Sequence, residues 1–179
     1  MQTRLPLRAL KKGTPTIPLF FTENLAKKIV KEFGKAKVIT ANNCIAHLDD
    51  LHDLMRGVDA LLADDGVFIV EANYWGGMIK NCNYSLIYHD HFSYFSFSVW
   101  TKFAQKFGFD LVDAIVTPAQ GGSMRMTFSK NSEMFESQNV YDWLEKEKKE
   151  KLNILATCEQ FADDVKKSAK KLRKLVKEI

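Results

Sequence analysis

The segment Tyr88–His91 reads Tyr-His-Asp-His and gathers side chains that enzymes use to move protons. In an extended segment, residues two apart share a side, so Tyr88 and Asp90 are expected to face one way. His89 and His91 are then expected to face the other way. A histidine with a carboxylate neighbour is poised as a general base near neutral pH, and a tyrosine hydroxyl can donate to a developing enolate or alkoxide oxygen.

Two other roles are compatible with the same residues. His89 and His91 form a His-x-His pair, and Asp90 can supply a third metal ligand. Alternatively, the histidines only satisfy buried carbonyl groups in a loop. The residues by themselves therefore leave acid–base chemistry, metal binding and a structural role open.

Further polar side chains follow the predicted strands. The β-branched run 37–41 ends at Asn42 and Asn43, with His47 shortly after it, and Tyr74 follows the next apolar run. In doubly wound sheets, ligands bind beyond the carboxyl ends of the strands. We therefore expect these side chains to converge with the histidine-rich segment, although the position of His47 is equally typical of a structural histidine.

The elements that must position these residues can be read from the pattern of apolar and capping residues. Strands are predicted from short apolar runs at residues 37–41, 67–71, 109–117 and 124–129. Helix starts are predicted from capping residues at Thr22, Asp49 or Asp50, and Ser96 or Ser98. A turn is predicted at Asp64–Gly66, and an irregular, aromatic-rich loop is predicted over residues 72–96. The alternation of strands and helices predicts an α/β fold with a partial doubly wound, mostly parallel sheet.

The last two predicted strands are joined by a loop that contains Gly121, Gly122 and Ser123, and they predict an antiparallel hairpin at the end of the sheet. This loop is either a plain turn or a place where the backbone can approach a ligand. From about Asn139 the pattern changes to charged, amphipathic helix. We therefore predict an α/β domain over residues 1–135 and a helical appendage over residues 136–179.

Composition excludes several classes of protein. The chain has 179 residues, a net charge of +4 and no apolar run long enough for a membrane span, so a cytoplasmic protein with no membrane partner is expected. Its three cysteines lie far apart and indicate neither a zinc site nor a disulfide framework. The basic run 166–177 alternates with an apolar stripe and contains no aromatic residue, so nucleic-acid binding is only a remote alternative.

Four motifs occur in an order that resembles the sugar C-methyltransferases, which act on nucleotide-linked keto-deoxysugars. They lie at Ala41–Leu48, Asp65–Glu71, Tyr88–Ser96 and Gly121–Arg125. The Tyr-His-acid-His motif followed by Phe-Ser-Tyr-Phe is the most specific of them. The resemblance covers about residues 8–178.

The resemblance implies a Rossmann-like methyltransferase fold and S-adenosylmethionine as the methyl donor. It also implies a nucleotide-sugar substrate, whose enolate attacks the methyl group after a base has removed the proton beside the ketone. By motif position His91 is that base, and the implied supporting residues are Tyr88, Asp90, His47 and His89. Ala41, Asn42 and Asn43 are expected at the cofactor. Tyr74, Gly121, Gly122 and Ser123 are expected at the substrate, and no metal is expected.

The chain also departs from the family pattern. Asp90 stands where the family usually has Glu, Gln120 stands where His usually precedes Gly-Gly-Ser, and residues 72–74 read Ala-Asn-Tyr instead of Val-Pro-Tyr. The family's cysteine-rich module and its Gly-rich cofactor loop have no counterpart in the sequence. We therefore expect an internal piece of such an enzyme with weak or no cofactor binding. The alternative is a non-catalytic remnant that keeps the fold.

This reading makes one expectation about assembly. A strand over residues 37–41 without its usual neighbour exposes a sheet edge. Either the segment Thr14–Pro18 pairs with that edge, or two chains associate there as a homo-oligomer.

Overall fold

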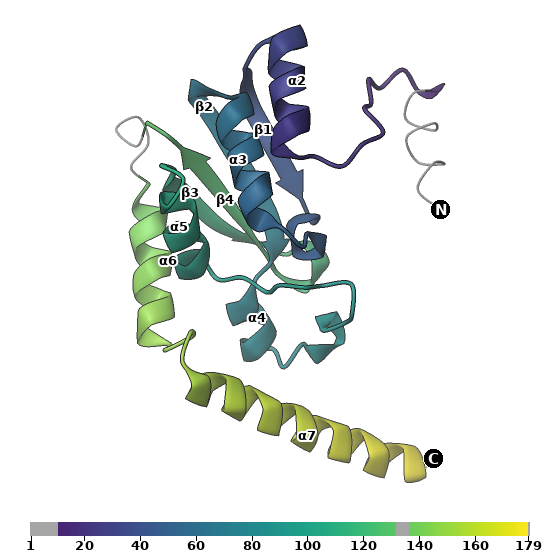
Figure 1. The fold of residues 1–179 in the computed structure, drawn as a ribbon. Coiled ribbons are helices and arrows are strands. Elements are labelled where there is room, and N and C mark those ends of the chain that lie inside the picture. Colours follow the sequence, from purple (N-terminus) through teal and green to yellow (C-terminus); the bar gives the residue numbers. More distant parts are fainter. Residues whose placement is uncertain (1–10, 132–136, 179) are drawn as a thin grey trace.

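A four-stranded sheet forms the centre of the computed structural model, which describes residues 11–131 and 137–178 (Figure 1). The strand order is β1-β2-β4-β3, and the strands are β1 (Ala36–Asn42), β2 (Leu62–Asn73), β3 (Asp110–Thr117) and β4 (Ser123–Ser129). β1 pairs with β2 in parallel, whereas β4 is antiparallel to both β2 and β3. Three strands thus run in one direction, and the hairpin β3–β4 ends the sheet. The predicted α/β class is confirmed.

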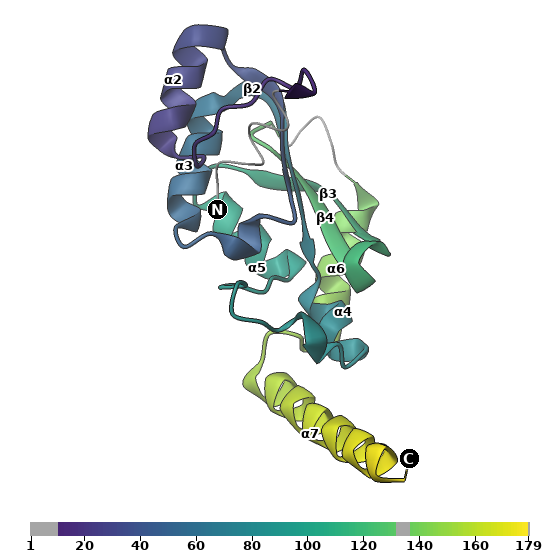
Figure 2. The ribbon, with the colours of Figure 1, turned by 90° about the vertical axis from the view of Figure 1, so that its right-hand side faces the viewer.

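Three helices begin at predicted caps, and all three lie on one side of the sheet (Figure 2). They are α2 (Glu23–Phe33), α3 (Leu51–Leu61) and α5 (Phe97–Gln105). In each, the side-chain oxygen of the cap accepts a hydrogen bond from an N–H of the first turn, as Asp50 does from the Asp53 N–H at 2.8 Å. The other two caps are Thr22 and Ser96.

Large apolar side chains fill the space between this helical layer and the sheet. Phe68 of β2 and Phe128 of β4 are register partners, are fully buried and have ring centres 6.3 Å apart. Trp100 of α5 packs on Phe128 with ring centres 6.0 Å apart. Burying each such side chain contributes about 1.5–3 kcal/mol, so this contact fixes α5 against the hairpin.

Two local predictions were wrong. β2 begins at Leu62, and the predicted turn at Asp64–Gly66 is an irregularity within the strand, between the pairs Ala36–Leu62 and Val38–Val67. The predicted irregular loop contains the short helix α4 (Trp75–Lys80). This helix requires glycine at Gly76, because an added Cβ would lie 2.6 Å from the ring of Tyr74.

β1 forms one edge of the sheet, and among the described residues its partner strand is β2. Thr14–Pro18 is not part of a strand, so the expectation that this segment pairs with the edge was wrong. The side chain of Val38 on β1 is 55% exposed.

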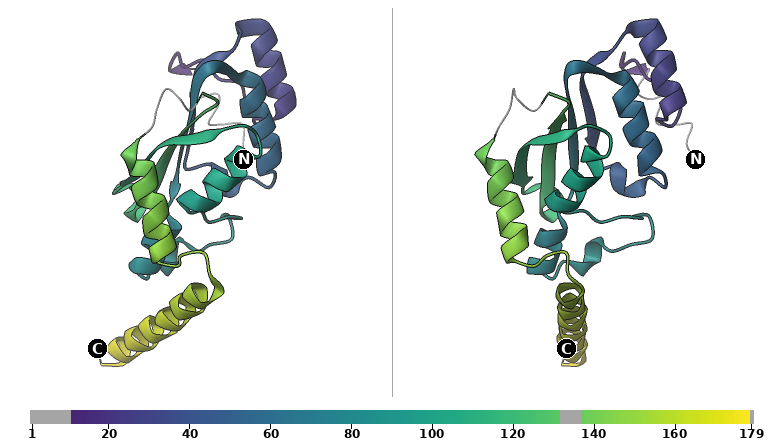
Figure 3. Two further views of the ribbon diagram at one scale, coloured as in Figure 1. Left: turned by 90° about the vertical axis from the view of Figure 1, so that its left-hand side faces the viewer. Right: turned by 60° about the vertical axis from the view of Figure 1, so that its left-hand side comes forward.

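Two helices follow the sheet. α6 (Gln138–Lys149) lies beside β3, and α7 (Leu155–Lys177) extends away from the body of the protein (Figure 3). Phe161 of α7 is buried and packs on Trp75 with ring centres 5.5 Å apart. The predicted domain boundary at 135/136 lies outside the described residues. No helix in residues 11–131 and 137–178 combines the length and apolarity needed to cross a membrane.

Candidate active site

The segment Tyr88–His91 forms a turn at the carboxyl ends of β1 and β2. The N–H of His91 donates to the carbonyl oxygen of Tyr88 at 3.1 Å, which closes the turn. A turn brings its first and fourth residues together, so the phenol oxygen of Tyr88 lies 2.9 Å from Nε2 of His91. The expected alternation of sides, which assumed an extended backbone, was wrong for this reason.

The two middle residues of the turn point away from this contact. Nε2 of His89 lies 2.7 Å from a carboxylate oxygen of Asp90, and the His89 side chain is 95% exposed. The Asp90 carboxylate therefore pairs with His89, and it acts on His91 through its charge. The backbone carbonyl of Asp90 has a different role, because it accepts a hydrogen bond from Nδ1 of His47 at 2.8 Å.

His47 is held against His91 by a short 3-10 helix, Ile45–His47, that follows β1. The buried residues Ile45 and Ala46 anchor this helix, and the carbonyl of Ala46 accepts the N–H of Phe92 at 2.8 Å. The rings of His47 and His91 meet edge to face, with centres 4.7 Å apart. Because a carbonyl can only accept, Nδ1 of His47 carries a proton and donates it in this hydrogen bond.

Burial is the main cause that lowers the pKa of His91 below its ordinary value, and the neighbouring His47 lowers it further. The backbone of Leu86 and, to a smaller extent, the carboxylate of Asp90 raise this pKa but do not outweigh the two lowering causes. His91 is therefore neutral near pH 7. A neutral imidazole is the form that can accept a proton.

These side chains line a cavity of about 160 Å³. The residues around it come from the ends of β1 and β2, the 3-10 helix, the Tyr88–His91 turn and the β3–β4 loop. They are Asn43, Ala46, His47, Ala72, Asn73, Tyr88, His91 and Gln120. Four of the predicted site residues, from three separate segments, thus meet at one place.

Three polar atoms of the cavity-lining residues are buried and have no hydrogen-bond partner in the described part of the chain. They are Oδ1 of Asn43, Nδ2 of Asn73 and Nδ1 of His91. Asn43 holds a positive φ of 50°, and its N–H donates to the carbonyl of Glu71 at 2.7 Å. Unpaired buried polar atoms and left-handed backbone both cost free energy and are concentrated at functional sites.

Other predicted site residues do not line the cavity. Ala41 and Tyr74 belong to the core, and Tyr74 packs on Phe97 and Trp143 with ring centres 5.2 and 5.7 Å away. Asn42 is exposed at the end of β1. Burial raises the pKa of the Tyr74 hydroxyl, as does the carboxylate of Glu147, so this hydroxyl stays protonated.

The Gly-Gly-Ser loop, Gly121–Ser123, is joined by a hydrogen bond to the chain just after β2. The carbonyl of Gly122 accepts the N–H of Tyr74 at 3.1 Å, and the fully buried Ser123 hydroxyl donates to the carbonyl of Ala119 at 3.0 Å. The amide nitrogen of Asn83 would lie 3.1 Å from a Cβ at Gly121. The neighbouring residue Gln120 lines the cavity and has a positive φ of 54°.

Sequence reasoning missed Asn73 and Gln120 as cavity residues. Both stand at positions where the chain departs from the family pattern described above. Asn73 is also the last residue of β2, where ligands of doubly wound sheets bind. Each signal was available in the sequence, but only the fold brings the two positions together.

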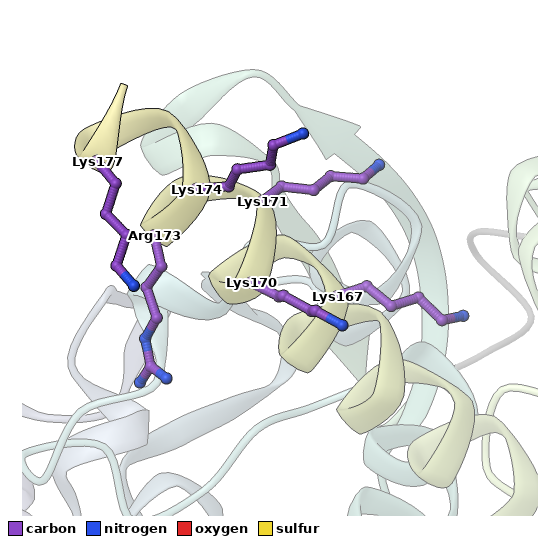
Figure 4. A pocket seen from close by; sticks show the side chains of 6 residues that line it. All are labelled: Lys167, Lys170, Lys171, Arg173, Lys174 and Lys177. Atoms are coloured by element: carbon purple, nitrogen blue, oxygen red, sulfur yellow. The ribbon is translucent and has the colours of Figure 1, made fainter. Parts of the chain in front are cut away.

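The described residues contain no group of three or more His, Cys, Asp or Glu side chains that could hold a metal ion. Six basic residues of α7 form a separate surface, on which their side chains spread outward from the helix (Figure 4). They are Lys167, Lys170, Lys171, Arg173, Lys174 and Lys177. Lys167 is paired with Asp164 at 3.0 Å, and this surface lies on a different element from the cavity.

Residues 6–114 match the family model of a methyltransferase domain, and residues 118–179 match a C-methyltransferase C-terminal domain. The chain is similar to the C-methyltransferase NovU of Streptomyces niveus, with 31% identity over 167 residues, which are 93% of this chain and 40% of that protein. The chain thus spans less than half the length of the curated relative it matches. Because the first match covers more than half of its residues, the chain belongs to the methyltransferase-domain family.

Proposed function

We propose that this chain takes part in C-methylation by removing the proton beside the ketone of a nucleotide-linked keto sugar. The observation that carries the proposal is the meeting of neutral His91, the Tyr88 hydroxyl and His47 at one cavity. The family matches support the methyl transfer. The keto-sugar substrate rests on the Tyr88–Ser96 motif.

The proposed proton step uses the side chains in a defined way. A neutral imidazole, that of His91, takes the proton from the carbon beside the ketone, so a C–H bond breaks and an N–H bond forms. The electron pair moves to the ketone oxygen and gives an enolate, the carbon nucleophile that C-methylation requires. A hydroxyl donor such as Tyr88 stabilises that oxygen, and a positioned base contributes about 10²–10⁴-fold to the rate.

The family implies S-adenosylmethionine as the methyl donor, which supplies an electrophilic methyl group when it is bound. The cavity of about 160 Å³ is smaller than the roughly 300–1,000 Å³ of ordinary ligand sites, so it has room for only part of a ligand of that size. Asn43 reaches the cavity, whereas Asn42 is exposed and Ala41 is buried in the core. We therefore assign to this chain the proton step and expect it to bind the donor weakly or not at all.

Hydrogen exchange tests the proton step without any methyl donor. The 179-residue chain is incubated in D₂O with a nucleoside-diphosphate-linked keto hexose, and deuterium at the carbon beside the ketone is followed by mass spectrometry. His91→Ala is expected to slow the catalysed exchange about 100-fold or more. His52→Ala is the matched control, since His52 lies on α3 against Phe103 and Phe107 and does not line the cavity.

Two outcomes would count against the proposal. Equal exchange in the wild type and His91→Ala would exclude His91 as the base. No exchange above the rate in buffer would favour the alternative of a non-catalytic remnant. Calorimetry with S-adenosylmethionine separates the donor question, because micromolar affinity would contradict the assignment of the proton step alone.

We also propose that two chains associate at the β1 edge. Val38 on this edge and Phe33 on α2 are large apolar residues with 55% and 70% exposure. Light scattering is expected to give a dimer that Val38→Lys dissociates, whereas Val99→Lys, at a 46% exposed valine of α5, leaves it intact. A wild-type monomer at all concentrations would contradict this proposal.

A further inference from the structure

Asn73 presents its amide from a rigid position in the cavity wall. It is the last residue of β2 and is the register partner of Ser123 on β4, so its backbone is fixed by the sheet. The N–H of the next residue, Tyr74, donates to the β3–β4 loop. A side chain on such a strand end is held more precisely than one on a free loop.

Asn43 presents a second amide from the end of β1. Its backbone is held by the hydrogen bond to the carbonyl of Glu71, and its side chain lines the same cavity as Asn73. Oδ1 of Asn43 and Nδ2 of Asn73 are both buried and lack partners within residues 11–131 and 137–178. Each of these two cavity-lining residues thus carries one buried polar atom that the described part of the fold leaves unpaired, an acceptor on Asn43 and a donor on Asn73.

We infer that Asn43 and Asn73 recognise a hydroxyl group of the substrate's sugar ring, close to the carbon that loses its proton; this inference rests on the proposed function. A hydroxyl is a group that can accept a hydrogen bond from Nδ2 of Asn73 and donate one to Oδ1 of Asn43 at the same time. A ring carbon that carries only hydrogen leaves both amides unpaired. A buried polar group left unpaired costs free energy, so such a site disfavours the analogue that lacks the hydroxyl.

The size of the cavity determines which part of the substrate it can recognise. Its volume of about 160 Å³ equals the space of roughly five water molecules, which suits part of a sugar ring and not a nucleotide. His91 lines the same cavity, so the hydroxyl that Asn43 and Asn73 recognise lies near the proposed base. Asn43 and Asn73 are thus specificity-determining residues and not proton carriers.

The test compares two probes that differ by one oxygen atom. One is a nucleoside-diphosphate-linked keto hexose with a hydroxyl on the carbon adjacent to the reacting carbon, and the other is its deoxy analogue. Calorimetry on the 179-residue chain is expected to give about tenfold tighter binding of the hydroxylated probe. Asn73→Ala is expected to reduce this preference to about twofold or less.

Controls separate recognition from folding. Asn81→Ala, at an exposed asparagine that does not line the cavity, is expected to keep the tenfold preference of the wild type. Asn73→Asp keeps the size of the side chain but removes the donor, so it is expected to lose the preference as Asn73→Ala does. Circular dichroism melts confirm that each variant is folded.

The outcomes distinguish this inference from the proposed function. Equal binding of both probes by the wild type would overturn the inference, and hydrogen exchange in the hydroxylated probe would still support the proton step. Preference retained in both Asn73 variants would also overturn it. Failure of both probes to bind or exchange would overturn the proposed function together with the inference.

Discussion

Two polar sites of this protein differ in whether the fold satisfies their hydrogen-bonding groups. At the start of α5, the carboxylate of Glu147 is 2% exposed and accepts from the N–H groups of Phe97 and Ser98 at 2.8 and 2.9 Å. It also accepts from the Ser98 hydroxyl at 2.6 Å. At the cavity, by contrast, Asn43 and Asn73 each keep a buried polar atom unpaired within the described residues.

This difference distinguishes a site that stabilises the fold from a site that is available to a ligand. A carboxylate at a helix N-terminus satisfies free N–H groups and interacts favourably with the helix dipole, so Glu147 joins α6 to α5. The cavity amides contribute no comparable bond to the folded chain. Polar groups that a fold leaves unsatisfied are the ones that remain available to a ligand.

The largest effect is expected from Glu147→Ala. This change leaves two buried or half-buried N–H groups without partners and should lower the free energy of unfolding by about 3 kcal/mol. Urea denaturation measures the loss. Glu145→Ala is the control, because Glu145 is 57% exposed and its contact with Lys148 is a surface pair, so a change below about 0.5 kcal/mol is expected. Equal losses in both variants would refute the capping role.

A smaller loss is expected from Ser98→Ala. The variant removes the hydrogen bond from the Ser98 hydroxyl to the carboxylate, and it also removes the bond that this hydroxyl accepts from Asn153. The two backbone bonds to the carboxylate remain, so the free energy of unfolding should fall by about 2 kcal/mol. In Glu147→Ala the same serine change should cost clearly less, since its acceptor is gone. A double-mutant cycle by urea denaturation measures this coupling, and strict additivity would show that the two side chains act independently.

The pH dependence of hydrogen exchange tests the proposed role of His91 in the cavity. Because the pKa of His91 is lowered by burial and then by His47, the neutral base should persist below the ordinary histidine pKa of about 6.5. Exchange should therefore stay constant as the pH falls to 6.5 and decline only below the lowered pKa of His91. By the same linkage, the unfolded chain takes up this proton first, so His91 disfavours folding increasingly as the pH falls below 6.5.

NMR titration of the His91 ring checks this shift directly. His47→Ala is expected to raise the pKa of His91 towards its ordinary value without restoring it, because burial is the larger cause. The charged and titratable neighbours that remain around the ring are Tyr88, Asp90 and Tyr94. A His91 pKa above 6.5 in the wild type would contradict the burial argument.

The smallest effect on stability is expected from Asn73→Ala. Its side-chain donor makes no hydrogen bond within the described residues, so its removal should change the free energy of unfolding by less than about 0.5 kcal/mol. Thermal and urea denaturation measure the change. A loss comparable to that of Ser98→Ala would mean that Asn73 has a structural partner, and the contrast between the two sites would then fail.

Local chemistry was sufficient to predict much of the fold. Thr22, Asp50 and Ser96 cap their helices, because capping depends on residues within one turn. The strands were predicted from short apolar runs, which are typical of strands with buried faces. β1 was found in this way although most of its residues are exposed. The helix α4 was missed, because its glycines signal a turn unless the Tyr74 ring is known to lie over Gly76.

The sequence by itself determined the caps, the strands and the residue types of the candidate site, since each depends on neighbours along the chain. Only the tertiary structure decided which side chains meet. The turn at Tyr88–His91 turned Asp90 outward, the fold brought Asn73 and Gln120 to one cavity, and Glu147 reached α5 across about fifty residues. These contacts join segments far apart in sequence, and no local propensity encodes the distances between them.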